Sequence, residues 1–584
     1  MRIIIDKNVT VPMRDGVVLA ADVYRPDGAG PFPTLVMRLP YNKEAGRYLV
    51  SYFDIFRGAQ AGYAIVIQDT RGRWASGGQF TPFSDEARDG ADTIGWAAAQ
   101  PWSTGAVGMI GGSYFGATQW TAATETPGVL RAIAPMVTTD QYYDGWAYQG
   151  GAFQLGFNLH WTLSSLAVGE VMRRMGAGHA SGQASGQDFA VLAAAIDGND
   201  ELYRRLPLRG LAELRELAPY YDEWLSHPSY DDFWRATAPR ESYDRITVPA
   251  LNIGAWHDLF LQGTLANYTG MKAHGGSEAA RQRQRLVIGP WAHGAMSGWF
   301  PERSYGLMSG IDTADITRLQ LRWFDWLLKG EDTGLAAEKP VRLFVMGANQ
   351  WRDEDDWPLP DTEYVSYFLH SGGLANTAGG DGCLSADAPG DEPEDVYLYD
   401  PRDPVPTTGG ATFLPGLFIG ANAGPRDQRS VEARRDVLCY TTGPLAEPLE
   451  VIGPVAAVLH VSSSAPDTDF TAKLVDVAPD GRAENLADGI VRARYRESLA
   501  EPSLLEPGRT YEITIDLVAT AAVFGAGHRI RLEVSSSNFP RFDRNTNTGG
   551  VIATEGESDL RQAVNRVHHA RATPSRLILP VIRR

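Results

Sequence analysis

Cysteine is almost absent from this chain: 584 residues include only Cys383 and Cys439. Two thiols exclude a disulfide framework and a cysteine-rich metal site, and they are typical of a protein from a reducing compartment. The sequence leaves open whether these two cysteines pair.

Long apolar runs are also lacking. The first ten residues, MRIIIDKNVT, hold only three successive isoleucines before Asp6 and Lys7, whereas a signal peptide needs about 7–15 apolar residues there. No stretch approaches the roughly 18 apolar residues of a membrane span. We therefore expect a cytoplasmic protein with no membrane partner.

Positive charge is in the minority. Lys and Arg number 53 against 71 Asp and Glu, for a formal net charge of −18. A negative surface disfavours nucleic acids and anionic membranes, because both carry negative charge themselves. The remaining partner class that we expect is a small molecule.

The first 140 residues alternate strands with helices. The segments 33–40 (PTLVMRLP) and 63–72 (YAIVIQDTRG) are short apolar runs that end in polar turns, as strands buried on both faces of a parallel sheet do. Residues 85–100 begin with acidic side chains and continue with an apolar face, which predicts a helix. This β-α-β-α order predicts an open α/β sheet.

The composition changes along the rest of the chain. Residues 141–245 have helical periodicity, which predicts a helical insertion, and residues 246–350 return to α/β patterning, with strands at 249–256 and 285–291. Residues 351–584 contain many short β-runs separated by Pro, Gly and Asp, which predicts a β-sandwich or jelly roll. The predicted division is therefore an α/β core in two parts, 1–140 and 246–350, a helical insertion at 141–245 and a β domain at 351–584.

One serine lies among glycines where a predicted strand ends. The stretch 107–116, VGMIGGSYFG, places Ser113 between a strand and a helix, and its small neighbours allow a sharp turn. This context is that of a nucleophile elbow, but Phe115 occupies the place of the last glycine in G-x-S-x-G. From the motif alone, a nucleophile and an ordinary structural turn both remain open.

Two later residues fit the acid and the base that such a serine needs. Asp258 follows the strand at 249–256, and His293 follows the strand at 285–291. The chain order Ser, acid, His is that of the α/β-hydrolases. His257 also follows a strand, but it precedes Asp258 and reverses the order. We therefore predict His293 as the base.

The oxyanion of an acyl-transfer reaction needs hydrogen-bond donors. The amide N–H of Tyr114, directly after the serine, is one candidate. The loop RLPYNK (38–43) contains Tyr41, whose hydroxyl could be a second donor. A tyrosine with only a packing role remains the alternative at this point.

Several motifs in this order resemble the bacterial cocaine esterase family and, more loosely, α-amino-acid ester hydrolases, glutaryl acylases and X-prolyl dipeptidyl peptidases. They are RLPYNK, VIQDTRG, GMIGGSYFG, AWHDLF, GPWAHG and SSSNFPRFDRN, and the likeness runs from residue 11 to residue 584. The resemblance implies an α/β-hydrolase domain with an inserted helical cap and a C-terminal jelly roll. It also implies a serine hydrolase that uses no metal or organic cofactor.

Residue by residue, the resemblance assigns the nucleophile to Ser113, in a G-x-S-Y-x-G form of the elbow. It assigns the acid to Asp258, the base to His293, and the oxyanion donors to the hydroxyl of Tyr41 and the N–H of Tyr114. The implied acyl pocket consists of aromatic and aliphatic residues: Trp146, Trp161, Phe260, Phe413 and Leu414.

The expected function is therefore a serine esterase that hydrolyses carboxylic esters through an acyl-enzyme intermediate. The alternatives are an α-amino-acid ester hydrolase or an X-Pro dipeptidyl peptidase, which need carboxylates near the acyl pocket. A ligand-binding protein with an inactive hydrolase domain is an alternative of another class. The natural ester is not evident from the sequence, and strand edges of the jelly roll leave a homo-oligomer possible.

Overall fold

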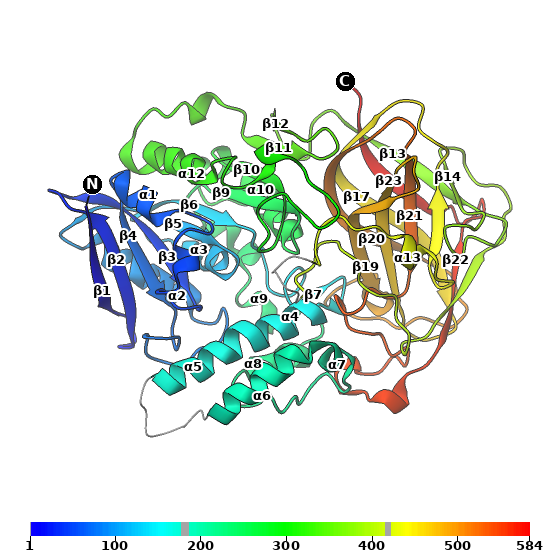
Figure 1. Cartoon of the computed structure of the whole chain (residues 1–584), viewed down its shortest axis with the longest axis horizontal. Helices are drawn as coiled ribbons and strands as arrows, with labels where there is room; N and C mark the ends of the chain where they lie inside the picture. The colour runs from blue at the N-terminus through cyan, green and yellow to red at the C-terminus, as the bar shows by residue number, and fades with distance from the viewer. Residues whose placement is uncertain (1, 177–185, 415–421) are drawn as a thin grey trace.

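The computed structural model describes residues 2–176, 186–414 and 422–584 of the chain. Figure 1 shows three regions: an α/β part in blue and green, a group of cyan and teal helices below it, and a β-rich part in yellow to red. The chain leaves the α/β part for the helices and returns to it before it enters the β-rich part.

The α/β part is built on a ten-stranded sheet with the order β1-β2-β4-β3-β5-β6-β9-β10-β11-β12. The strands from β4 to β11 in this order run parallel, whereas β1, β2 and β12 join antiparallel at the two edges. The bounds are β1 Ile3–Pro12, β2 Val18–Pro26, β3 Phe32–Leu39, β4 Ala64–Asp69, β5 Ser103–Gly112, β6 Leu130–Met136, β9 Leu251–His257, β10 Arg285–Ala292, β11 Val341–Val345 and β12 Gln350–Glu354.

Alternate residues of the central strands pack against helices on opposite faces of this sheet. On β3, Leu35 and Met37 join the core beneath α1 and α12, while Val36 joins the core beneath α2 and α3. Both faces are apolar because both are covered, which is why these strands read as continuous apolar runs. The helices are α1 Ile55–Gln60, α2 Glu86–Ala98, α3 Tyr114–Thr124, α10 Leu261–His274, α11 Glu278–Gln282 and α12 Ile316–Phe324.

The inserted region is mainly helical, as predicted. Its helices are α4 Leu155–Trp161, α5 Val168–Gly176, α6 Gly186–Asp197, α7 Asn199–Arg204, α8 Tyr220–Ser226 and α9 Asp232–Arg235, and a π-helical turn at Thr162–Ala167 joins α4 to α5. The region also contains a small hairpin of β7 Tyr148–Gln149 and β8 Ala152–Phe153. The sequence analysis missed this hairpin, which Gly150 and Gly151 turn at φ values of 53° and 82°.

The C-terminal part is a β domain whose strands pair almost entirely antiparallel, with one parallel contact between Cys383 and Thr441. Both cysteines are free thiols. The elements are β13 Thr362–His370, β14 Cys383–Ser385, β15 Asp395–Tyr399, α13 Arg429–Glu432, β16 Leu438–Thr441, β17 Leu449–Ser463, β18 Asp469–Val477, β19 Ala483–Arg492, β20 Tyr511–Phe524, β21 Arg529–Ser535, β22 Ala563–His568 and β23 Arg576–Ile582.

A buried ion cluster joins the β domain to the helical region. Arg492 donates to Asp469 at 2.9 Å and to Asp543 at 2.7 Å. Asp543 also accepts the amide N–H of Phe153, on β8, at 2.9 Å. One carboxylate therefore serves both regions and fixes their relative position.

The α/β-hydrolase core, helical insert and C-terminal β domain confirm the predicted fold class. The four-part division of the chain stays a prediction, and its boundary at 350 falls at the first residue of β12, in the hydrolase sheet. Within residues 2–176, 186–414 and 422–584, no helix combines the length and the apolar character of a membrane span.

Candidate active site

Ser113 occupies a sharp turn between β5, which ends at Gly112, and α3, which begins at Tyr114. Its backbone has φ 57° and ψ −128°, a conformation that residues with a side chain rarely adopt. Its amide N–H donates to the carbonyl of Met136 on the neighbouring strand β6 at 2.9 Å. The turn therefore holds the serine at the carboxyl edge of the sheet, as a nucleophile elbow requires.

Close packing explains why glycines surround this serine. A Cβ atom on Gly112 would lie 2.8 Å from the ring of Tyr52, and one on Gly116 would lie 2.9 Å from the carbonyl oxygen of Met136. Phe115, at the place where the strict motif has its glycine, is instead buried in the core. The position that must be glycine, because the Met136 carbonyl lies so close, is residue 116, one place later than in the strict motif.

Three polar side chains from distant segments form a continuous chain of hydrogen bonds. His293 Nε2 lies 3.0 Å from Ser113 Oγ, and His293 Nδ1 lies 2.8 Å from Asp258 Oδ2. The other carboxylate oxygen of Asp258 accepts the amide N–H of Phe260 at 2.7 Å. The loops after β9 and β10 bring Asp258 and His293 to the edge where Ser113 lies.

His257 is in a different environment. Its Nε2 lies 3.1 Å from the hydroxyl of Tyr305. The nitrogen that contacts Ser113 belongs to His293. Burial lowers the pKa of His257 to about 3, so its ring is neutral at pH 7. The structure therefore places His293, and not His257, beside the serine.

The two candidate oxyanion donors lie close to Ser113. The hydroxyl of Tyr41 accepts a hydrogen bond from the indole N–H of Trp161 at 2.9 Å, which leaves its own proton for another acceptor. Burial raises the pKa of Tyr41 well above its usual value, so the hydroxyl stays protonated. Tyr114 is the first residue of α3, where an amide N–H has no carbonyl partner within the helix.

A cavity of about 190 Å³ opens beside the serine. Tyr41, Trp161 and Phe413, all predicted from the sequence, line it together with Ser113 and His293. The lining also includes residues that the sequence analysis missed, and these are Arg47, Tyr48, Ser51, Tyr52, Phe115, Phe157, Ser165 and Gly294. The concentration of tyrosines directly after RLPYNK was the available signal for Tyr48 and Tyr52.

The other predicted pocket residues lie elsewhere. Trp146 stacks on Phe260 with ring centroids 4.3 Å apart, and Phe260 meets the His293 ring edge-on at 5.0 Å. Phe260 thus packs against the His293 ring, Trp146 packs against Phe260, and neither is among the residues that line the cavity. Leu414 lines a separate cavity, together with Tyr203 and other residues. Their roles in substrate binding stay predictions.

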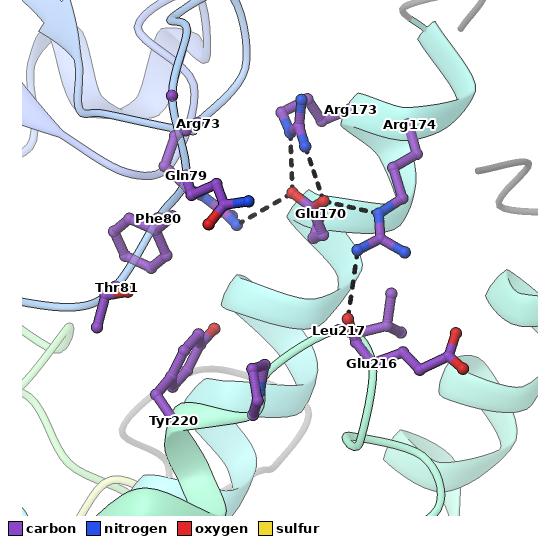
Figure 2. Close-up of a pocket in the computed structure, with 13 residues that line it drawn as sticks. Arg73, Gln79, Phe80, Thr81, Glu170, Arg173, Arg174, Glu216, Leu217 and Tyr220 are labelled. Atoms are coloured by element: carbon purple, nitrogen blue, oxygen red, sulfur yellow. Dashed lines mark hydrogen bonds and ion pairs between the residues drawn. The ribbon is translucent and has the colours of Figure 1, made fainter. Parts of the chain in front are cut away.

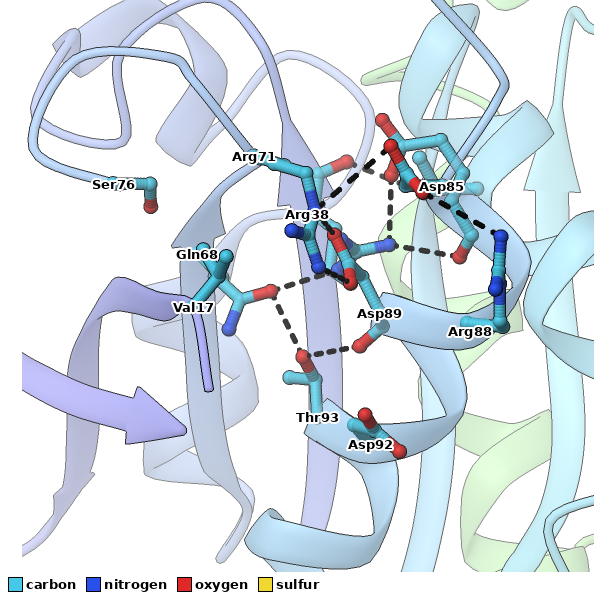
Figure 3. A network of polar contacts seen from close by, with 12 residues as sticks. Val17, Arg38, Gln68, Arg71, Ser76, Asp85, Arg88, Asp89, Asp92 and Thr93 are labelled. Atoms are coloured by element: carbon cyan, nitrogen blue, oxygen red, sulfur yellow. Dashed lines mark hydrogen bonds and ion pairs between the residues drawn. The ribbon is translucent and has the colours of Figure 1, made fainter. Parts of the chain in front are cut away.

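A buried polar network links Arg38 and Gln68 to residues of α2 (Figure 3). Arg38, on β3, is fully buried and donates to Gln68 Oε1 at 2.7 Å and to Glu86 Oε2 at 2.8 Å. Arg71 binds Asp89 through two hydrogen bonds of 2.9 and 2.6 Å. These contacts attach α2, which carries Glu86 and Asp89, to the strands of the sheet.

This network reaches the residue beside the serine. The hydroxyl of Tyr114 donates to Glu86 Oε1 at 2.9 Å and accepts the amide N–H of Phe83 at 3.0 Å. Burial raises the pKa of Glu86, and Arg38 opposes that rise, so the ionised carboxylate depends on this guanidinium. The hydroxyl of Tyr114 is therefore held by the same carboxylate that pairs with Arg38.

Comparison with known proteins identifies the family. Residues 15–295 match the X-Pro dipeptidyl-peptidase (S15 family), and residues 333–578 match the X-Pro dipeptidyl-peptidase C-terminal non-catalytic domain. A cocaine esterase of a Rhodococcus species is 45% identical over 589 residues, which cover 99% of this chain and 98% of the relative. The chain belongs to the S15 family and is a cocaine esterase homologue.

Solved structures agree over the whole length of this S15 family member. An aminopeptidase from a marine sediment Thaumarchaeota archaeon has a TM-score of 0.80 at 27% identity, and covers 100% of this chain and 96% of its own. An α-amino acid ester hydrolase has a TM-score of 0.78 at 26% identity, covering 99% and 96%. The predicted enzyme class is confirmed: the S15 family member is a cocaine-esterase-like serine esterase, a carboxylic ester hydrolase.

Glu86→Gln should destabilise the protein, because it leaves the buried Arg38 guanidinium without its closest carboxylate partner. Removing one partner of a buried ion pair costs about 3–5 kcal/mol of unfolding free energy. Thermal unfolding followed by circular dichroism measures the effect. The control is Asp85→Asn, next to Glu86. Its contacts with Arg88 and Arg71 are 3.8 and 3.9 Å long, too long for hydrogen bonds, so it should change stability by less than about 1 kcal/mol. Equal melting temperatures for the two variants would contradict this account of the network.

Proposed function

We propose that Ser113, His293 and Asp258 are the catalytic triad of this esterase. His293 Nε2 takes the hydroxyl proton as Ser113 Oγ attacks the ester carbonyl, and then gives it to the departing alcohol. Asp258 holds the ring tautomer and stabilises the imidazolium. Water repeats the same steps on the acyl-enzyme and releases the acid. The observation that carries this proposal is the unbroken hydrogen-bond chain between the three side chains.

The oxyanion of each tetrahedral intermediate is bound, in this proposal, by the hydroxyl of Tyr41 and the N–H of Tyr114. The positive end of α3 adds to the stabilisation because its N-terminus faces the same point. Trp161 acts as a positioning residue: its N–H occupies a lone pair of Tyr41, so the tyrosine proton is directed elsewhere. Donors fixed before the reaction need no reorganisation when charge develops.

The substrate class that we propose is an ester with an apolar or aryl acyl group. The walls of the cavity are rich in aromatic rings, and Trp161 stacks on Phe157 with parallel rings 5.6 Å apart. Among the described residues that line it there is no Asp or Glu, and Arg47 is present. A substrate ammonium would find no counter-charge there, which disfavours an α-amino-acid ester hydrolase or a dipeptidyl peptidase. The cytoplasmic location and any homo-oligomer stay predictions.

Ser113→Ala should reduce kcat by on the order of 10⁶, because it removes the group that forms the acyl-enzyme. Hydrolysis of 4-nitrophenyl acetate and labelling by a fluorophosphonate both measure the loss. Ser165→Ala is the matched control, since Ser165 lines the same cavity, whereas the ring of His293 bonds to Ser113 and Asp258. Near-normal turnover by Ser113→Ala would refute the triad. If the unmodified protein showed neither turnover nor labelling, the ligand-binding alternative would be favoured.

Tyr41→Phe should reduce kcat by about 10²–10³ and leave KM nearly unchanged, because an oxyanion donor acts mainly in the transition state. The control is Tyr48→Phe, since the two rings stack 5.4 Å apart and both line the cavity. Steady-state kinetics on one aryl ester compares the two variants. If both lose the same small factor, Tyr41 has only a packing role.

A panel of matched esters separates the proposed substrate class from its runner-up. We expect phenylacetate-type esters to exceed their α-amino analogues in kcat/KM by at least tenfold, because Arg47 and the apolar walls disfavour an ammonium group. The panel varies only the α-amino group and keeps the alcohol constant. A preference for the α-amino esters would instead assign the chain to the amino-acid ester hydrolases.

A further inference from the structure

A second, larger cavity of about 570 Å³ lies between the hydrolase core and the helical region. Loop residues that follow β4 form one wall, and α5 with the start of α8 forms the other (Figure 2). Its size is in the range of small-ligand sites. Arg73 separates it from the catalytic cavity, because its guanidinium donates to the carbonyls of Pro40 at 3.0 Å and Leu166 at 3.1 Å.

Positive charge exceeds negative charge on the inner wall of this cavity. Arg73 is 2% exposed, and its contact with the carboxylate of Glu170 is 4.0 Å long. The same carboxylate already pairs with Arg173 at 2.8 Å and Arg174 at 2.7 Å. The other acidic residue of the lining, Glu216, is exposed and directs its carboxylate away from this group (Figure 2). Three guanidinium groups thus share one buried carboxylate.

A hydroxyl group without a partner faces the same space. Tyr220 is 7% exposed, and its hydroxyl has no hydrogen-bond partner among the described residues. Figure 2 shows that this hydroxyl points into the cavity. Burial raises the pKa of Tyr220, so the group is a neutral donor at pH 7. A buried donor left unpaired is costly, which marks the place where a ligand acceptor would be favourable.

The rest of the wall combines the polar side chains of Gln79 and Thr81 with an apolar surface. Phe80 and Tyr220 meet edge-on with ring centroids 6.0 Å apart, and Leu217 and Pro219 continue the surface. The guanidinium of Arg73 covers the ring of Phe80 at 4.9 Å. An inorganic anion would leave these rings in water, whereas an aromatic anion would cover them.

We propose that this cavity is a second binding site, separate from the catalytic one, for a small aromatic carboxylate. The carboxylate accepts the hydrogen bond of Tyr220 and faces the arginines that share Glu170. The aromatic ring of the ligand lies against Phe80 and Leu217. The proposal does not depend on the role assigned to Ser113.

The test is calorimetric titration of the full-length protein with benzoate, after treatment with phenylmethylsulfonyl fluoride to block the catalytic serine. We expect saturable binding that the neutral analogue benzamide does not reproduce. Tyr220→Phe should weaken benzoate binding by about tenfold, because a hydrogen bond to a charged group is lost. The same variant should not lower the melting temperature, since it deletes an unpaired buried hydroxyl.

Tyr221→Phe is the matched control. Tyr221 is the next residue of α8, it is 1% exposed, and its hydroxyl also lacks a hydrogen-bond partner among the described residues, but it does not line the cavity. Its substitution should leave benzoate binding unchanged. The proposal is overturned if benzoate does not bind, if both variants weaken it equally, or if inorganic phosphate at equal concentration displaces it. If benzoate bound the untreated protein but not the blocked protein, its site would be the catalytic cavity, and the proposal would also be overturned.

Discussion

The constraint on which the site depends is the backbone turn at Ser113. A residue with a side chain is held there at φ 57°, and its neighbours Gly112 and Gly116 have no room for a Cβ, because the Tyr52 ring and the Met136 carbonyl lie too close. Such strain persists only where the surrounding packing holds it. Here the Met136 carbonyl accepts the serine N–H, and the rings of Tyr52 and Phe115 fill the space beside the turn.

The edge of the parallel sheet then determines what the serine can meet. Strands β5, β9 and β10 end at the same edge, so the loops after them bring Asp258 and His293 to Ser113 from segments far apart in the chain. The helical insert and the β domain complete the surroundings, the first with Trp161 and the second with Phe413. The hydrogen bond from the Phe153 N–H to Asp543 joins these two regions, and Arg492 pairs with the same carboxylate inside the β domain.

Buried charge is used differently in the two parts of the core that surround this site. At Arg38, one guanidinium lies 2.8 Å from Glu86 and 3.8 Å from Asp89, and Glu86 in turn accepts the hydroxyl of Tyr114. Around Glu170, one carboxylate serves three arginines, and a neighbouring tyrosine hydroxyl has no partner within the described residues. Carboxylates outnumber the guanidinium at the first place, whereas the excess of positive charge and the unpaired hydroxyl at the second favour a ligand that brings a negative charge and an acceptor.

Local pattern indicated the α/β class and located the three polar side chains, but the family resemblance was needed to assign Ser113 as a nucleophile and not a structural turn. Continuous apolar runs reveal strands covered on both faces, and Ser113, Asp258 and His293 each follow such a run directly. The hairpin at Gly150 and Gly151 was missed because two-residue strands leave no periodicity. The cavity wall could not be predicted in full: Trp146 and Trp161 look alike in sequence, yet only Trp161 lines the cavity. Which aromatic ring faces a cavity depends on packing between segments far apart in the chain, and tertiary structure alone decides that.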